Sequence, residues 1–189
     1  MIHSLNESPL QGNTMKVLAF AASNSQNSIN KMLATYAANL IKGAEIEVLD
    51  INDYEMPIFS DVREAQLGQP QQAQDFFKKL GEADAIIISY AEHNGSYTAA
   101  FKNLFDWTSR IDMKLYQNKP ILMLATSPGP GGAASVLASA AGSAHYFAAD
   151  VKATLSIPSF FDNFDVKKQV LTNRELNEKL QAAVALLSL

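Results

Sequence analysis

The sequence predicts an α/β fold: a doubly wound, five-stranded parallel sheet with helices on both faces and strand order 2-1-3-4-5. The main evidence is three apolar runs, at residues 17–22, 85–89 and 121–126. Uninterrupted runs of this length are typical of strands buried on both faces, as in a parallel sheet covered by helices. A short polar or glycine-containing turn follows each run. Because open α/β folds bind ligands beyond the carboxyl ends of their strands, we expect these three turns to form the functional site.

The first half of the chain alternates helix and strand after the opening run. Apolar residues recur at helical spacing over residues 29–41, and Gly43 can end this helix. Residues 45–50 predict the second strand. A long loop, residues 51–69, follows it, and loops of this length are usually functional or mobile. Pro70 suits the start of the next helix, whose apolar stripe is Ala73, Phe76, Phe77 and Leu80.

The second half of the chain repeats the alternation. We expect a helix over residues 98–111, a fourth strand over 119–126 and a helix rich in small residues over 133–147. Residues 151–157 alternate apolar and polar side chains, which is typical of an edge strand, and a last helix covers 173–188. Right-handed crossovers leave few topologies for five strands and five helices. The order 2-1-3-4-5 places the two least uniformly apolar strands, the second and the fifth, at the edges.

Length and composition narrow the classes of protein. A chain of 189 residues suits one domain. We expect this domain at residues 15–189, after a polar, flexible extension, residues 1–14, without the apolar core of a secretion signal. A net charge of −4 and a pI near 5.3 argue against nucleic-acid binding, and no apolar stretch reaches membrane-spanning length. The absence of cysteine excludes disulfides and thiol catalysis, and is compatible with the reducing cytoplasm, where we expect the protein.

The first turn has the chemistry of a phosphate site. Ser23, Ser25, Ser28 and Asn30 surround the start of a predicted helix, whose free amides and positive dipole attract anions without lysine or arginine. The alternative is that Ser28 merely caps the helix while the other serines fill a polar turn. Neither a G-x-G-x-x-G after the first strand nor a G-x-x-x-x-G-K-[ST] occurs. A mononucleotide is therefore favoured over the NAD of a dinucleotide-binding fold or the ATP of an ATPase.

The second and third turns, residues 91–96 and 127–132, contain glycines. Glycine lets the backbone approach a flat ring system closely and present its N–H and C=O groups to the ring edges. The alternative is an ordinary strand-to-helix turn, and for each turn alone we favour that interpretation.

Together, the three turns resemble those of the NAD(P)H-dependent FMN reductases, flavodoxin-like proteins that include quinone and azo-dye reductases. That family's first motif, G-S-x-R-x-x-S-x-N, is matched by residues 22–30. Its second, P-E-Y-N-x-S followed by K-N-x-x-D-W, is matched by residues 91–96 and 102–107. Its third has the S-P-G-x-x-G-G character of residues 127–132. The resemblance covers roughly residues 15–158.

The resemblance implies FMN as cofactor, with its phosphate in the first turn and its ring between the second and third. The phosphate turn contributes Ser23, Ser25, Gln26, Ser28 and Asn30. The residues expected around the ring are Glu92, His93, Asn94, Gly95, Ser127, Pro128, Gly129, Gly131 and Gly132.

Three residues depart from the family pattern. Ser25 stands where the family often has a phosphate-binding arginine, which bears on affinity, and Ala91 and His93 replace proline and tyrosine beside the flavin. As an imidazole next to reduced flavin, His93 could donate a proton. The alternative, which we favour, is a positional contact with ring, substrate or a neighbouring subunit. We interpret Glu92 as a hydrogen-bonding or interface carboxylate rather than a catalytic base.

Other polar and aromatic residues have structural interpretations. Neither His3 nor His145 has a partner at metal-ligand spacing, so we expect no metal site. Trp107 lies at helical spacing with apolar neighbours and is expected in the core or an interface. Asp106 and Arg110 are expected to form an ion pair within one helix.

The expected function is that of a flavoprotein oxidoreductase. NAD(P)H would reduce bound FMN, and the electrons would pass to a small acceptor such as a quinone, an azo compound or free flavin. The resemblance also suggests a homodimer or homotetramer. One alternative is a flavodoxin-type electron carrier, and another is a member of the fold that has lost flavin. A receiver-like signalling domain would need an acidic cluster at residues 21–24, which read Ala-Ala-Ser-Asn.

Overall fold

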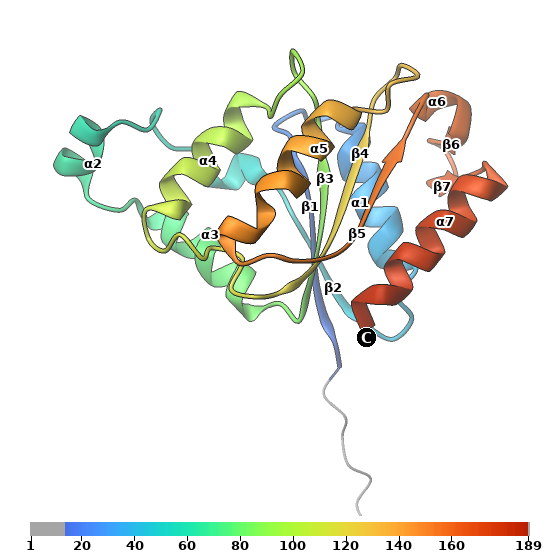
Figure 1. Cartoon of the computed structure of the whole chain (residues 1–189), viewed down its shortest axis with the longest axis horizontal. Helices are drawn as coiled ribbons and strands as arrows, with labels where there is room; N and C mark the ends of the chain where they lie inside the picture. The colour runs from blue at the N-terminus through green and yellow to red at the C-terminus, as the bar shows by residue number, and fades with distance from the viewer. Residues whose placement is uncertain (1–13, 189) are drawn as a thin grey trace, which may run out of the picture.

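The computed structural model describes residues 14–188 and contains a five-stranded parallel sheet of order β2-β1-β3-β4-β5 (Figure 1). This confirms the predicted fold class and strand order. The strands are β1 Lys16–Ala22, β2 Glu45–Leu49, β3 Ala85–Tyr90, β4 Pro120–Thr126 and β5 Asp150–Ile157. The division of the chain into an extension, 1–14, and one domain, 15–189, stays a prediction, because residues 1–13 and 189 lie outside the described residues.

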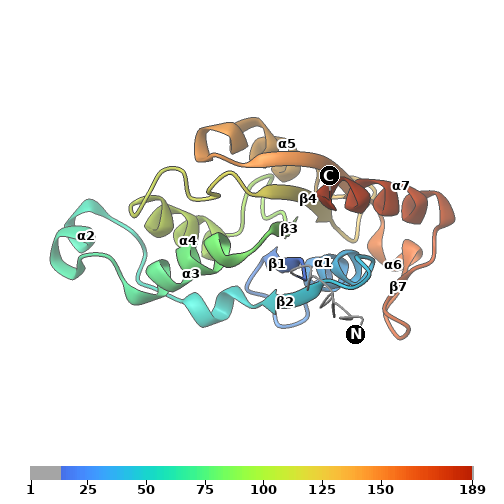
Figure 2. The same ribbon diagram turned by 90° about the horizontal axis from the view of Figure 1, so that it is seen from below.

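Helices cover both faces of the sheet (Figure 2). The face covered by α1 and α7 buries Val17 and Ala19 of β1, whereas Leu18 and Phe20 face the side covered by α3, α4 and α5. This alternation follows from the two-residue period of a strand. The helices are α1 Ile29–Asn39, α3 Gln71–Glu82, α4 Ala99–Ser109, α5 Ala134–Ser143 and α7 Arg174–Ala185.

The central and edge strands differ in burial as the sequence predicted. All six residues of β3 are buried, whereas β2 and β5 are mostly half-buried or exposed. A central strand in a doubly wound sheet is covered on both faces, and an edge strand is not. Trp107 is also buried, in the core, and its indole Nε1 donates a 2.7 Å hydrogen bond to the carbonyl of Pro57.

The long loop predicted at residues 51–69 contains two short helices, so that prediction was incomplete. They are the 3₁₀ helix η1, Ile51–Tyr54, and α2, Asp61–Leu67. Ser60 caps α2 by accepting a hydrogen bond from the amide of Arg63, and Gly68 ends it at φ +66°. Such one- or two-turn helices show no hydrophobic periodicity.

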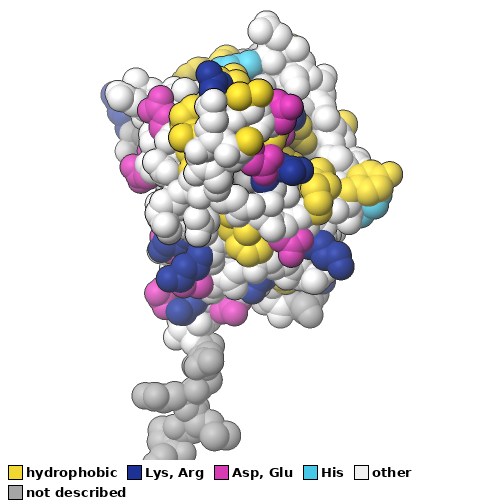
Figure 3. Space-filling view, turned by 90° about the vertical axis from the view of Figure 1, so that its left-hand side faces the viewer, with side chains coloured by type: hydrophobic (Ala, Val, Ile, Leu, Met, Phe, Trp, Pro, Cys, Tyr) yellow, Lys and Arg dark blue, Asp and Glu magenta, His cyan; other side chains and the backbone are white. Residues whose placement is uncertain are grey.

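The helix α2 stands away from the rest of the molecule (Figure 1). Val62 and Leu67 of α2, and Ile58 just before it, are exposed. The face seen from this end carries apolar side chains between acidic and basic ones (Figure 3).

The C-terminal region holds further elements that the sequence did not predict. Between β5 and α7 lie the short helix α6, Phe160–Asn163, and a hairpin of β6, Phe164–Asp165, with β7, Val170–Leu171. The helix predicted over 133–147 is α5 continued by the 3₁₀ helix η2, Ala144–Phe147, and the last helix ends in η3, Leu186–Ser188. The expectation of five helices was therefore too low.

The expected ion pair between Asp106 and Arg110 is wrong. Lys102, one turn earlier on α4, places its Nζ 2.7 Å from Oδ1 of Asp106. Arg110 instead reaches Glu64 on α2, with Nε 2.9 Å from Oε1. The Arg110–Glu64 pair links α2 to the body of the molecule, a contact that helical spacing could not reveal.

No helix within residues 14–188 combines the length and the apolar character needed to cross a bilayer.

Candidate functional site

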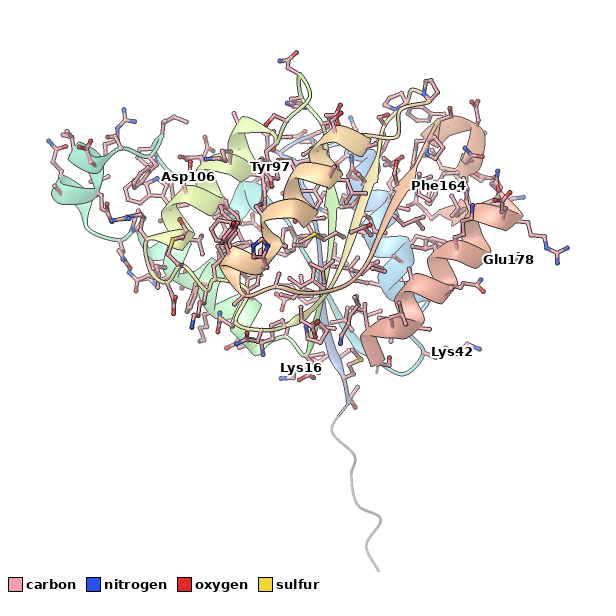
Figure 4. All side chains as sticks on the ribbon, viewed as in Figure 1. Lys16, Lys42, Tyr97, Asp106, Phe164 and Glu178 are labelled. Atoms are coloured by element: carbon pink, nitrogen blue, oxygen red, sulfur yellow. The ribbon has the colours of Figure 1, made fainter. Side chains whose placement is uncertain are left out.

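The turns after β1, β3 and β4 meet at the carboxyl edge of the sheet. Figure 4 shows Tyr97 near this edge and Lys16 at the opposite one. The three turns border an open cavity of about 250 Å³ that unites eight of the fourteen predicted cofactor residues. Those eight are Ser23, Ser25, Ser28, Asn30, Glu92, His93, Ser127 and Pro128. The cavity also contacts four residues that we had not predicted as ligands, Asn27, Ile29, Ala91 and Thr126. Each lies inside or next to a motif, so proximity in sequence was the available signal.

The first turn is both a helix cap and a source of free donors. Ser28 is the N-cap of α1, and its Oγ accepts a 3.1 Å hydrogen bond from the amide of Lys31. The intrahelical ladder starts only with the amide of Met32, which donates to the carbonyl of Ser28. The amides of Ile29 and Asn30 precede that first bond, and both residues belong to the cavity lining. The capping role of Ser28 is therefore compatible with a phosphate site.

Serine hydroxyls complete the polar lining of the first turn. Ser23 is buried, and its Oγ accepts a 3.2 Å hydrogen bond from the amide of Ser25. Accepting this bond leaves the hydroxyl proton of Ser23 free to donate. Ser25 is exposed at the cavity. These groups suit an anion that accepts several hydrogen bonds.

The cavity lining includes the carboxylate Glu92, so an anion bound there depends on the amides and hydroxyls of the first turn rather than on a cation. None of the described lysines and arginines lines the cavity. Lys31, the cation nearest in sequence to the first turn, is paired with Asp50 at 2.6 Å. The hydrogen bond from Lys31 lowers the pKa of the Asp50 carboxyl, because it stabilises the ionised form. Lys31 is thus held by Asp50, the residue that follows β2.

The side chain of Asn30 faces the protein interior. Its Nδ2 donates to the carbonyl of Thr126 at 3.1 Å, and its Oδ1 accepts from the amide of Thr126 at 3.1 Å and from Oγ of Ser89 at 2.7 Å. All three residues are buried. The side chain of Asn30 therefore binds the ends of β3 and β4.

The second turn is a tight hairpin rather than an open loop. His93 and Ser96 exchange backbone hydrogen bonds of 3.0 and 3.1 Å. Asn94 and Gly95 form the turn at φ +51° and +76°, which identifies a type I′ turn. The Asn-Gly pair is the sequence signal for this turn. His93 and Asn94 are exposed, and Asn94, Gly95 and Gln26 do not line the cavity.

Aromatic side chains on either side of this hairpin in the sequence pack against one another. The ring of Tyr90, at the end of β3, lies 5.9 Å from Tyr97 and 5.7 Å from Phe101. Tyr90 is buried against Tyr116, and burial raises the pKa of both phenols. Both tyrosines therefore stay neutral and act as packing groups.

Glu92 has a structural partner. Its Oε2 accepts a 2.9 Å hydrogen bond from the amide of Val136, in the first turn of α5. The N-cap of α5 is Ala133, which has no side-chain acceptor to offer. Glu92 therefore caps α5 from another loop, a role that agrees with the hydrogen-bonding carboxylate expected from the sequence.

The glycines of the third turn differ in role. A Cβ on Gly132 would collide with Oγ of Ser156 and lie 3.1 Å from the nitrogen of Pro158, and the residue has φ +58°. Gly132 thus permits close packing against β5. A Cβ on Gly129 or Gly131 would meet nothing within 4 Å, so the backbone there is open to an approaching ring. These three glycines lie outside the cavity lining.

Comparison with known proteins assigns the family. Residues 15–162 match the model of the NADPH-dependent FMN reductases. This match covers most of the chain, which therefore belongs to that family of oxidoreductases, and it confirms the resemblance found in the sequence.

Two relatives of this chain are named quinone oxidoreductases. The chain is 31% identical over 125 residues to an NADPH:quinone oxidoreductase of Arabidopsis thaliana, a match that covers 64% of this chain and 62% of the relative. It is 29% identical over 186 residues to an NAD(P)H:quinone oxidoreductase of Solanum tuberosum, which covers 90% of this chain and 89% of the relative. The chain thus spans less than two thirds of the length of the Arabidopsis relative.

Among solved structures, the flavoenzyme NAD(P)H:(acceptor) oxidoreductase FerB of Paracoccus denitrificans superposes with a TM-score of 0.72 at 23% identity. The superposition covers 93% of this chain and 96% of FerB. At this identity, the likeness establishes the shared fold.

Proposed function

We propose that the protein is a flavin-dependent oxidoreductase that uses NAD(P)H to reduce a small acceptor. FMN, when bound, supplies the hydride and electron transfer between the two substrates. The observation that carries the proposal is the single cavity in which three family motifs converge. Its free helix-terminal amides and serine hydroxyls fit a terminal phosphate, and open glycines adjoin it.

The chain's own residues would bind and orient the cofactor. The amides of Ile29 and Asn30, with the hydroxyls of Ser23, Ser25 and Ser28, would hold the phosphate. Gln26 stays a predicted contact from the same turn. Phosphate binding by neutral donors is sufficient at a helix N-terminus, because the dipole and unpaired amides already favour an anion.

The second and third turns would flank the ring. This role is proposed for His93, Asn94 and Gly95 on one side and for residues 127–132 on the other. Glu92 would hold the second turn against α5 through its bond to Val136. We assign His93 a positional role, because the hairpin presents it at the cavity and no proton relay to it is needed when the cofactor carries the chemistry.

A quinone is the acceptor class that relatives support best, since those from Arabidopsis and Solanum are both named quinone oxidoreductases. Azo compounds and free flavin are further proposed acceptors.

We also propose that the protein works in the cytoplasm as a homodimer or homotetramer. Sedimentation equilibrium would measure the assembly.

The test is a flavin titration followed by turnover. We expect the apoprotein to quench FMN fluorescence stoichiometrically, and the complex to oxidise NADH or NADPH rapidly when a quinone is added. Binding of FMN without oxidation of either nucleotide would favour the flavodoxin-type carrier. Absence of FMN binding would favour a member that has lost flavin.

A further inference from the structure

Most of the polar side chains buried within the described residues lie at the cavity or near it. The whole set comprises Ser23, Ser28, Asn30, Ser89, Thr98, Thr108 and Thr126, of which all but Thr108 lie at the carboxyl edge of the sheet. Buried polar groups are costly unless they are hydrogen-bonded, and each of these side chains has a partner. Because six of these side chains lie at one edge of the sheet, core packing alone does not explain their position.

Asn30 is the centre of this network. Its amide group pairs with both the N–H and the C=O of Thr126, across 96 residues of sequence, and receives a third bond from Ser89. Thr126 in turn donates from Oγ1 to the carbonyl of Ile157 at 2.7 Å. One side chain therefore connects the start of α1 to the ends of β3 and β4, and through Thr126 to β5.

The position of Asn30 links this connection to the cavity. Asn30 lies in the first turn of α1 and lines one wall, and Thr126 directly precedes Ser127 and Pro128 on another. The two-point contact between an amide side chain and a peptide group fixes both distance and orientation, because two parallel hydrogen bonds allow little rotation. The width of the cavity between the first and third turns thus depends on this contact.

We infer that Asn30 is a positioning residue, which sets the spacing between the phosphate site and the ring site and so tunes the protein to a ligand that must engage both. This inference rests on the proposed function. FMN would span the two sites with its phosphate and its ring. Riboflavin lacks the phosphate and needs only one of them.

The experiment compares the affinities of FMN and riboflavin in purified apoprotein variants. Asn30→Leu keeps the branching at Cγ and the number of side-chain heavy atoms, although leucine is larger, and it removes all three hydrogen bonds. We expect the variant to bind FMN at least about tenfold more weakly. The peptide group of Thr126 loses both hydrogen bonds to residue 30, so the spacing between the first and third turns is no longer fixed. Riboflavin affinity should change by less than about threefold, because riboflavin does not engage the first turn.

Two control variants separate positioning from stability. Ser89→Ala removes only the third bond and leaves both contacts with Thr126, so FMN affinity should stay within about threefold of the wild type. Thr108→Val removes a buried hydroxyl that donates to the carbonyl of Leu104 at 2.7 Å, away from the cavity. It should lower the unfolding midpoint and leave both affinities in place.

The double variant Ser89→Ala/Asn30→Leu covers the case in which Asn30→Leu folds poorly. It removes the hydroxyl of Ser89 that the single change leaves unpaired, so it should be the more stable protein. It should nevertheless keep the selective loss of FMN affinity. Wild-type FMN affinity in either Asn30 variant that folds, or equal losses of FMN and riboflavin, would overturn the inference. Failure of the wild-type protein to bind FMN would instead overturn the proposed function.

Discussion

Replacing Gly132 with alanine tests the packing of the third turn against β5. The residue has φ +58°, a conformation that alanine adopts at a cost. A new Cβ would collide with Oγ of Ser156, which also donates a 2.7 Å hydrogen bond to the carbonyl of Gly132. The Cβ would also lie 3.1 Å from the nitrogen and 3.2 Å from the Cα of Pro158. Because Pro158 contributes backbone atoms, it cannot move aside as easily as a side chain.

The size of the effect follows from two contributions. The left-handed conformation costs an alanine roughly 1–2 kcal/mol. Insertion of a methyl group into a packed site adds typically about 1–3 kcal/mol. We therefore expect Gly132→Ala to lower the free energy of unfolding by about 2–5 kcal/mol.

Gly131 supplies a matched control in the same turn. A Cβ there would meet nothing within 4 Å, and the residue is not among those with positive φ. We expect Gly131→Ala to change the free energy of unfolding by less than about 1 kcal/mol. Urea denaturation of both variants measures the difference. Equal stability of the two would refute the argument, and the addition of Ser156→Ala to Gly132→Ala should recover part of the loss.

Three further predictions concern the cavity and its surroundings. Ser25→Glu should weaken FMN binding by about fivefold to a thousandfold, because two charges about 4 Å apart repel by roughly 1–4 kcal/mol between bulk and surface dielectrics; an equal loss for riboflavin in a parallel titration would count against a phosphate at this turn. His93→Gln should retain substantial NAD(P)H oxidation in a stopped-flow assay, and near-complete loss with flavin still bound would indicate proton transfer instead. Asp50→Asn should flatten the acid limb of the stability profile: Lys31 lowers the pKa of Asp50, so the pair stabilises the fold above the ordinary value of 3.8 and ceases to do so as the pH falls through the lower folded-state value. Urea unfolding across the acid range measures this, and an unchanged acid limb would show that the pair adds no pH-dependent stability.

Local sequence was sufficient for the sheet and for eight of the residues that line the cavity. Apolar runs such as 85–89 predict buried strands because burial on both faces demands apolar side chains at every position. The carboxyl ends of parallel strands necessarily share one edge, so the three turns had to meet. The Asn94–Gly95 pair also carried the geometry of its hairpin, since a type I′ turn favours these residues.

Other features depended on contacts between distant parts of the chain. Spacing along one helix suggested that Arg110 pairs with Asp106, but Glu64 on α2 comes closer in the folded molecule. The two short helices within residues 51–69 were missed because one or two turns carry no periodicity.

The sequence by itself therefore placed the three turns at one edge of the sheet and named eight of the residues that line the cavity there, because strand order and motif position follow from local pattern. Only the tertiary structure decided what each one does there. Asn30 was predicted as a cofactor ligand, but its side chain is hydrogen-bonded to Thr126. Glu92 caps α5, and Gly132 leaves room for the side chain of Ser156. The physical reason is that a hydrogen bond depends on distance and direction in space, and its partner can lie at any separation along the chain.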